Sequence, residues 1–239
     1  MSTSYNPEFY ADQQAGSRRS ADVILPLIFS IVKPKSVIDF GCGVGTWLAV
    51  SRALGASIIV GLDGDWVKSA ERQISDDNII TVDLSVPVQL DRKFDLAICM
   101  EVAEHLPEQR SESLVDDICK ASDVALFGAA IPNQGGTEHI NEQWQSYWAA
   151  LFARNGFQPF DAVRPNTWCN SSVDWWYRQN AILYMKPDTA SRLNYKAPIA
   201  TMLDVVHPEM ASRRYGVKRK LKHLFKAVFT DVKSRLNVS

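Results

Sequence analysis

The sequence predicts an α/β fold, in which a mostly parallel sheet carries helices on both of its faces. Short apolar runs alternate with longer segments of helical periodicity along most of the 239-residue chain. Several runs end in an acidic residue, and the first of them, at residues 36–40, leads into a glycine-dense turn. Parallel strands need long crossover connections, usually helices, so this alternation indicates a parallel sheet.

We expect seven strands in a Rossmann-like sheet. Val37, Ile38 and Phe40 suit a strand that is buried on both faces. Pro87 closes the connection that follows the third strand. The expected strands span residues 36–40, 58–62, 79–83, 95–100, 125–130, the chain around Val163 and 181–185, and the expected helices span 45–54, 65–74, 107–121 and 143–154.

The first strand leads into a turn that is suited to hold a nucleotide-like ligand. Gly41, Gly43 and Gly45 allow positive φ and let a ligand lie against bare backbone. Such a turn is a weak signal alone, because dinucleotide enzymes and ordinary turns also use it. Asp63, about twenty residues beyond the turn, is placed to accept the two hydroxyls of a ribose.

Acidic residues follow four successive strands of the predicted sheet. They gather at the carboxyl edge, where open α/β sheets bind ligands. A diphosphate would be repelled there, whereas S-adenosylmethionine carries a sulfonium and an ammonium group and no phosphate. The charges therefore favour this methyl donor over a dinucleotide. The four acids are Asp39, Asp63, Asp83 and Glu101.

The chain resembles the class I S-adenosylmethionine-dependent methyltransferases over roughly residues 15–186. The resemblance rests on the strings VIDFGCGVG, GLDGDWV, TVDL and FDLAICMEVAEHL, which occur in that family's order. It implies that Asp39 and the glycine turn line the methionine end, that Asp63 holds the ribose, and that Asp83 flanks the adenine. It also implies an antiparallel pair for the last two strands. The residues expected to bind the cofactor are Asp39, Gly41, Cys42, Gly43, Asp63, Gly64, Asp83, Leu84, Glu101 and Val102.

Composition and cysteine spacing limit the class of protein. A content of 46% hydrophobic residues suits a globular protein with one sizeable core. No apolar run approaches the roughly 20 residues that span a bilayer, and the polar start is no signal peptide, so we expect a cytoplasmic protein. The four cysteines form no Cys-x-x-Cys pair. We expect them to be reduced and packed, and neither a zinc site nor a cysteine nucleophile is indicated.

Charge is distributed unevenly along the chain. Residues 210–239 hold nine Lys or Arg and one Asp, a local charge of +8, which leaves −9 on the first 209 residues. From Val217 onward, apolar residues recur at helical spacing between basic ones, which predicts a basic amphipathic helix. Such a helix packs on its own domain or on a second subunit of a homodimer, or lies on the inner membrane face. Nucleic acid is not expected, because the body is acidic and lacks a reader motif.

Three regions are expected from these patterns. Residues 1–30 form an N-terminal lid segment, in which Tyr10 and Arg19 touch the donor or the acceptor, and disorder of this terminus is the alternative. Residues 31–187 form the methyltransferase domain. Residues 188–239 form a C-terminal extension with the basic helix.

An aromatic cluster between residues 130 and 184 suggests where a small-molecule or oligosaccharide acceptor binds. Five of the seven tryptophans lie there, and flat aromatic faces bind sugar rings. The alternative is that the cluster builds the core, which is favoured for Trp148. The residues expected to contact the acceptor from this segment are Trp144, Trp168, Trp176, Tyr177 and Arg178.

Two histidines are candidates for the base that removes a hydroxyl proton. His139 is the first candidate, with Glu142 one helical turn away to orient it. His105, in the string EVAEHLP, competes with it, although a structural or cofactor-pocket role is favoured there. A magnesium ion is a further option, but no spacing is a metal signature and no ligand is assigned. The groups that offer suitable atoms are Glu101, Glu104, His105, Glu138 and His139.

The predicted function is O-methylation of a saccharide or glycan hydroxyl. The strings GGTEHINEQWQSYWAALFARNGF and DWWYRQNAILY resemble a bacterial branch of the family that is associated with carbohydrate and secondary-metabolite pathways. The alternative enzyme acts on a small-molecule amine or phenol. A non-catalytic binding protein on the same fold is a third reading, and the complete set of strand-end acids argues against it.

Overall fold

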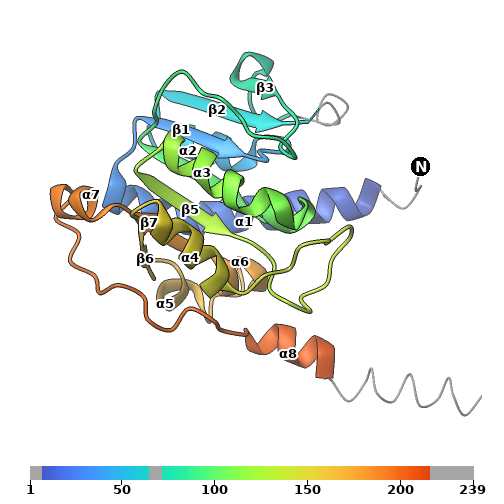
Figure 1. Ribbon diagram of the computed structural model, residues 1–239. Helices are drawn as coiled ribbons and strands as arrows, with labels where there is room; N and C mark the ends of the chain where they lie inside the picture. The colour runs from blue at the N-terminus through green and yellow to red at the C-terminus, as the bar shows by residue number, and fades with distance from the viewer. Residues whose placement is uncertain (1–6, 65–71, 216–239) are drawn as a thin grey trace, which may run out of the picture. The chain divides into compact units, whose positions relative to one another are not determined.

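One seven-stranded sheet forms the centre of the protein, as the sequence predicted. A computed structural model describes residues 7–64 and 72–215 (Figure 1). The sheet has the order β3-β2-β1-β4-β5-β7-β6. Its strands are β1 (Ser36–Phe40), β2 (Ile58–Asp63), β3 (Ile79–Thr81), β4 (Leu96–Met100), β5 (Val124–Gly128), β6 (Gln158–Phe160) and β7 (Ile182–Met185).

Strand direction confirms the expected topology. Strands β1 to β5 pair in parallel, and β7 runs antiparallel to both β5 and β6. The chain order reverses between β1 and β4, which are neighbours in the sheet. Ligands of open α/β sheets bind outside the carboxyl ends of the strands at such a reversal. The glycine turn after β1 begins at this point.

Helices and short 3-10 turns connect the strands. The helices are α1 (Pro7–Val32), α2 (Thr46–Ala53), α3 (Ser111–Ala121), α4 (Gln145–Arg154), α5 (Arg164–Thr167), α6 (Trp175–Asn180), α7 (Pro187–Arg192) and α8 (Pro208–Tyr215), and the 3-10 turns are η2 (Asp76–Asn78), η3 (Ala103–His105) and η4 (Glu108–Arg110).

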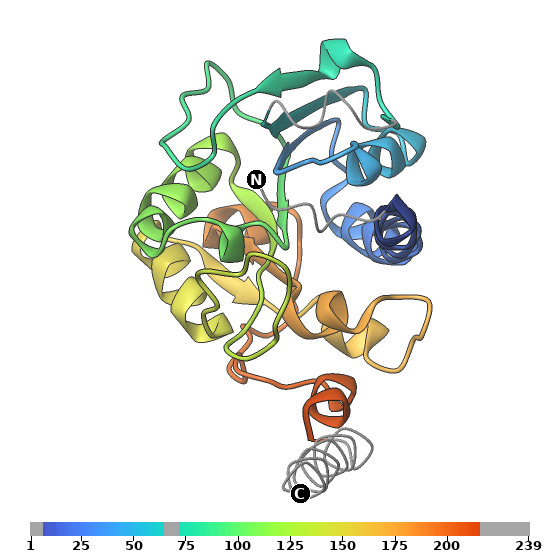
Figure 2. The same ribbon diagram turned by 90° about the vertical axis from the view of Figure 1, so that its right-hand side faces the viewer.

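Two apolar layers cover the faces of the sheet. Helices α1 and α2 pack on one face, and α3 and α4 pack on the other (Figure 2). Alternate residues of β4 enter the two layers, for example Ile98 and Cys99. Trp148 is 1% exposed and its ring lies 5.1 Å from that of Phe127, so the expected core role of Trp148 is confirmed. The four cysteines are free thiols, and all except Cys169 are buried.

Several predicted boundaries differ from the observed ones. The strand expected around Val163 is wrong in position, because β6 ends at Phe160 and Asp161 accepts a hydrogen bond from the Arg164 N–H at the start of α5. The strand expected at 79–83 ends at Thr81. The helix expected from 107 begins at Ser111, because residues 108–110 form a 3-10 turn after Pro107. The helix expected at 65–74 lies largely outside the described residues.

The chain divides into two compact units, Met1–Val205 and Val206–Ser239. The sheet and helices α1 to α7 belong to the first unit, and α8 belongs to the second. The predicted basic helix from Val217 onward lies outside the described residues. None of the helices that the structure describes has the length and apolar character needed to cross a bilayer.

Candidate functional site

The glycine turn after β1 is closely packed at two positions and open at a third. Gly41, Gly43 and Gly45 have left-handed backbone angles, with φ of 78°, 53° and 84°. A β-carbon on Gly41 would come within 2.4 Å of the Val102 side chain, and one on Gly45 within 2.5 Å of Ile74. No atom among the described residues lies within 4 Å of the same position on Gly43. A ligand can therefore approach the backbone at Gly43.

The turn is fastened to the neighbouring strand β2. The N–H groups of Gly41 and Cys42 both donate to the Leu62 carbonyl, at 2.8 and 3.1 Å. The Cys42 sulfur lies against Gly61, where a β-carbon would come within 2.5 Å of it. Burial raises the pKa of the Cys42 thiol above its ordinary value. Cys42 therefore packs the turn in its neutral form.

Asp63 connects the glycine turn to the end of β2. Its two carboxylate oxygens accept hydrogen bonds from the N–H groups of Gly43 at 2.6 Å and Gly64 at 2.7 Å. The residue is 5% exposed. Each carboxylate oxygen has a second lone pair that can accept from a hydroxyl. This geometry suits the predicted ribose contact, which stays a prediction.

Asp39 is a buried carboxyl in β1, two residues before the glycine turn begins. It is 2% exposed, and its Oδ2 has no hydrogen-bond partner among the residues that the structure describes. Burial, with a smaller contribution from the negative charge of Asp63, raises the Asp39 pKa well above its ordinary value. A cationic ligand group would supply the missing partner and favour the ionised form.

Asp83 and Leu84 follow β3 on a loop that a buried ion pair holds in place. Asp83 is exposed, and hydrogen bonds from Ser85 lower its pKa. The Leu84 carbonyl accepts from Arg110 Nε at 2.9 Å, and Arg110 pairs with Asp117 at 2.5 Å. Leu84 is buried whereas Asp83 faces solvent. The adenine contacts predicted for them stay predictions.

Glu101, at the end of β4, is the centre of a polar network. Its backbone has a φ of 56°, a left-handed angle that is unusual for glutamate, and its N–H donates to the Gly128 carbonyl at 2.8 Å. Its two carboxylate oxygens accept from the side-chain amides of Gln134 and Asn180, both at 3.0 Å. Burial raises the Glu101 pKa.

The amides of this network were missed by the sequence analysis. Gln179 also belongs to it, because its amide donates to the Gln134 oxygen at 3.0 Å. Gln179 and Asn180 close α6 just before β7. Because β7 is antiparallel, its first residues lie at the same edge as the carboxyl ends of the parallel strands. The implied antiparallel pair was therefore the signal from which these two residues could have been identified.

His139 and Glu142 lie together in the loop between β5 and α4. His139 Nδ1 is 3.1 Å from Glu142 Oε1, and their side chains are 12% and 19% exposed. The Glu142 carboxylate also accepts from the N–H groups of Asn133 at 2.6 Å and Gly135 at 2.7 Å. Glu142 thus orders the loop and orients the imidazole, which agrees with the predicted pairing.

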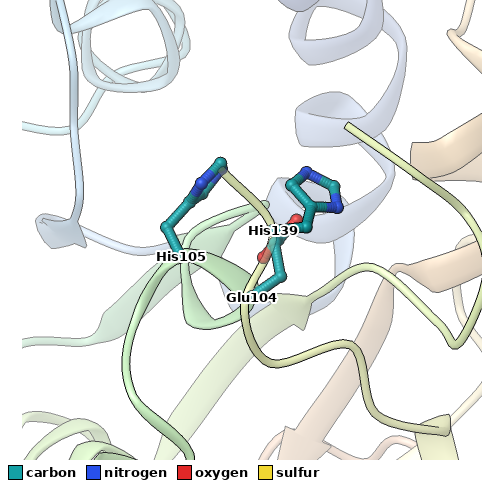
Figure 3. Close-up of side chains that lie close together, drawn as sticks. All are labelled: Glu104, His105 and His139. Carbon is teal, nitrogen blue, oxygen red and sulfur yellow. The ribbon is translucent and has the colours of Figure 1, made fainter. Parts of the chain in front are cut away.

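His105 and Glu104 face His139 from the 3-10 turn after β4, so the structure brings the two candidate histidines together (Figure 3). The two rings lie 4.9 Å apart at 87°. The turn and the loop are joined because the N–H groups of Ile140 and Asn141 both donate to the Glu104 carbonyl, at 2.9 and 3.0 Å. Burial and the neighbouring His139 lower the His105 pKa.

The aromatic segment is divided between core and surface. Tyr177 is buried edge-on against Trp47 with ring centroids 5.3 Å apart, and Arg178 is buried and donates to the Trp168 carbonyl at 3.0 Å. These contacts stabilise the α5–α6 region. Trp168 is half-buried. Acceptor contacts by these residues stay predictions.

Two tryptophans present more surface than their neighbours do. Trp144 precedes α4 and is 39% exposed, and Trp176 is half-buried. Trp175, between them in sequence, is 7% exposed. All three tryptophans predicted to contact the acceptor therefore have some ring surface available to a ligand, and Trp144 has the most.

The N-terminal segment forms a helix that contacts α6. Residues 7–32 are α1, and the Ser20 hydroxyl accepts from the Asp174 N–H at 3.0 Å. Arg19 is exposed, with its Nη2 at 4.0 Å from Asp174 Oδ1. Tyr10 lies in the first turns of α1, where the side chains are outside the described set. The lid role of Tyr10 and Arg19 stays a prediction.

Residues 10–164, more than half of the chain, match the family described as methyltransferase domain. The chain belongs to this family. A match of this extent covers β1 to β6 and thus the glycine turn, the four strand-end acids and His139. The sequence-based expectation of a methyltransferase is therefore confirmed, together with its fold.

Solved structures of methyltransferases share the fold of this methyltransferase domain. DesVI of Streptomyces venezuelae has a TM-score of 0.59 at 13% identity, and the match covers 75% of this chain and 95% of that one. Magnesium protoporphyrin IX methyltransferase (ChlM) from Synechocystis PCC 6803, solved with bound SAM, has a TM-score of 0.54 at 20% identity. The match covers 77% of this chain and 86% of ChlM. At these identities the likeness concerns the fold alone.

A curated relative is similar over a shorter stretch. Ribosomal protein L11 methyltransferase of Lactobacillus johnsonii is 33% identical over 91 residues. That stretch is 36% of this chain and 29% of the relative, so the chain matches less than a third of the relative's length.

Proposed function

We propose that this protein is an S-adenosylmethionine-dependent O-methyltransferase that acts on a saccharide hydroxyl. Membership in the methyltransferase domain family supports methyl transfer. The bound SAM in the ChlM structure, which has the same fold, supports the choice of donor. The acceptor class rests on the residues around the donor site.

The donor assignment depends on the buried Oδ2 of Asp39, which has no hydrogen-bond partner among the described residues, together with the open backbone position at Gly43. S-adenosylmethionine offers a cationic amino acid end, which would complete the hydrogen bonding of a buried carboxylate. Asp63 is placed twenty residues farther on with both oxygens fixed by backbone amides. The residues present therefore fit this group. When bound, it supplies an electrophilic methyl group on a sulfonium sulfur.

A hydroxyl acceptor is favoured because the site contains an oriented imidazole. An alcohol must lose its proton as its oxygen attacks carbon, and a positioned histidine assists that step. Glu142 fixes His139 through Nδ1, which leaves Nε2 to act on the acceptor. We therefore assign activation of the hydroxyl to His139, with Glu142 as its positioning residue. An amine acceptor that attacks in its neutral form has no such need.

A saccharide is favoured among hydroxyl acceptors because tryptophan surface is available near this loop. Trp144 directly follows the loop that carries His139, and it is 39% exposed. Indole faces stack on the apolar faces of sugar rings. The magnesium ion considered as an option forms no part of this proposal, since Mg²⁺ prefers oxygen ligands.

The proposal is tested by calorimetric titration of the donor and by a methyl-transfer screen with radiolabelled donor. The screen compares saccharides with phenols and amines. We expect donor binding, transfer to a saccharide, loss of donor binding in Asp39→Ala, and donor binding without transfer in His139→Ala. Transfer to amines alone would overturn the acceptor class, and absence of donor binding would overturn the function. The exposed Asp91→Ala variant serves as the control for Asp39→Ala.

A further inference from the structure

Glu104 is a buried carboxylate that the donor site does not explain. It is 0% exposed, and neither carboxylate oxygen has a hydrogen-bond partner among the residues that the structure describes. An ionised carboxylate is costly to bury without a compensating charge or hydrogen bond. Burial, with a smaller contribution from nearby Glu101, raises the pKa of Glu104 well above its ordinary value, and Glu101 is already bonded to Gln134 and Asn180 and supplies no positive charge. A cation would satisfy Glu104.

Two imidazoles stand where such a cation would bind. Glu104, His105 and His139 each offer a ligand atom, and these atoms all lie within 4.8 Å of one another. Figure 3 shows the two rings and the Glu104 side chain close together, with His105 and Glu104 on the turn after β4 and His139 on the loop before α4. Ligand atoms around a bound zinc ion lie about 3 to 3.5 Å apart. A rotation of the exposed His105 side chain shortens the remaining distance.

The three groups are held together by contacts outside the cluster. The N–H groups of Ile140 and Asn141 bond to the Glu104 carbonyl, which fixes the loop of His139 to the turn that carries Glu104 and His105. Glu142 holds the His139 ring at 3.1 Å. Metal-binding histidines usually bond through their other nitrogen to such a carboxylate, which orients the ring. The cluster thus has both ligands and an outer support.

We propose that Glu104, His105 and His139 bind a divalent transition-metal ion, with zinc as the reference ion. Two imidazoles and one carboxylate suit zinc, iron, cobalt or manganese and leave positions open for further ligands. Magnesium is disfavoured, because it prefers oxygen ligands at octahedral positions. The site follows the carboxyl ends of β4 and β5, since His105 lies in the turn after β4 and His139 in the loop after β5.

This inference rests on the proposed function and specifies how the hydroxyl is activated. An ion held by Glu104, His105 and His139 would act as a Lewis acid on the acceptor hydroxyl and lower the pKa of that hydroxyl. The hydroxyl proton leaves to solvent, the oxygen forms the bond to the methyl carbon, and the bond between that carbon and the donor sulfur breaks with its electron pair going to sulfur. His139 then assists activation of the hydroxyl as a ligand of the ion, and this role replaces the direct action of its Nε2 on the acceptor described for the proposed function.

Metal binding is tested on the full chain without reference to activity. The protein is treated with a chelator, dialysed and titrated with ZnCl₂ by calorimetry, and CoCl₂ is added in parallel to record the absorption of bound cobalt. We expect one zinc ion per chain, no binding of MgCl₂, and a cobalt spectrum of a nitrogen- and oxygen-ligated ion. A chain that takes up no zinc and no cobalt would overturn the site.

Variants separate ligands from their support. Glu142→Gln, which removes the support of His139, should lower zinc affinity by about 10- to 100-fold. His105→Ala and Glu104→Gln each remove a ligand and should lower zinc affinity more than Glu142→Gln does. Glu108→Gln, at an exposed acid of the following turn, is the matched control and should bind zinc normally. Equal zinc affinity in Glu104→Gln, His105→Ala and the control would place the ion elsewhere and overturn the assignment.

Activity then distinguishes this inference from the proposed function. Saccharide methylation that zinc restores after chelation supports both. If methylation persists in the chelator-treated protein, the ion does not activate the hydroxyl, and the proposed function is still supported. Zinc binding at the three residues without transfer to any hydroxyl overturns the proposed function and leaves the metal site standing.

Discussion

Gly136 is the residue whose substitution most directly tests the position of His139. A β-carbon at Gly136 would lie 2.2 Å from His139 Nε2 and 2.4 Å from Cε1. Since nonbonded heavy atoms approach to about 3.5 Å, Gly136→Ala must move the ring by about 1.3 Å. Gly136 does not have a left-handed φ, so alanine adds no backbone strain. The substitution therefore displaces His139 through steric contact alone.

We expect Gly136→Ala to fold normally and to bind the donor normally, while losing methyl transfer. The loop is exposed, and the clash is with the end of a side chain, which moves at small cost in stability. A misplacement of about 1 Å at a reacting group costs about 10²-fold in rate, or about 2.7 kcal/mol in the barrier. The assay is kcat with radiolabelled donor, with donor affinity measured by calorimetry.

Thr137→Ala is the matched control for this experiment. Thr137 is the next residue in the same exposed loop, and its truncation adds no atom near His139. The control should retain the kcat of the natural chain. Full activity in Gly136→Ala would refute the assignment of hydroxyl activation to His139, and weakened donor binding would show that the substitution disturbs more than the loop.

Four further substitutions test the donor site, the core and an exposed ion pair. Asp63→Ala should weaken donor binding by about 1 to 3 kcal/mol in calorimetry, because hydroxyls and backbone amides lose their partner, and unchanged affinity would refute the ribose contact. Asp39 has a raised pKa in the folded protein, so the folded state holds that proton more tightly than the unfolded chain does and stability declines as pH rises from about 4 toward the folded pKa. Asp39→Asn should remove this decline in thermal melts across pH, and an unchanged slope would contradict the burial argument. Arg110→Ala should lower the free energy of unfolding by about 3 to 5 kcal/mol, since it leaves Asp117 buried and unpaired, whereas Arg154→Ala, at an ion pair with both side chains about two-thirds exposed, should cost at most about 1 kcal/mol in urea titrations.

The central strands could be predicted because each is buried on both faces. Residues 36–40 and 96–100 are uniformly apolar apart from Ser36 and Asp39, and every one of them is buried in the sheet. The edge strand β6 could not be predicted in the same way. It has three residues including Pro159, and the nearby Val163 is buried through packing at the start of α5 rather than through a strand.

The candidate site was predictable where it depends on strand ends and unpredictable where it depends on loops. Asp39 and Asp63 lie together because parallel neighbours end at one edge. The meeting of Glu104 with His139 depends on hydrogen bonds from Ile140 and Asn141 to one carbonyl, which no spacing in the sequence expresses. The contact of Gln134 with Asn180, 46 positions later in the chain, likewise depends on the folded loop.

Because β7 runs in the reverse direction, the segment between β6 and β7 could be replaced by the corresponding segment of a related enzyme without a change in the order of the strands. Because β6 and β7 pair as antiparallel neighbours, the connection that contains α5 and α6 leaves and re-enters the sheet at its carboxyl edge. Both ends of the segment are anchored, by the pairing of Phe160 with Leu183 and by Arg164, which donates to the carbonyls of Met202 and Leu203. A graft of this segment from a related enzyme that keeps Gln179 and Asn180, which support Glu101, would thus alter the surroundings of the proposed acceptor site while β1, β2 and the glycine turn keep their positions. The fold in this way allows selectivity to diversify separately from donor recognition.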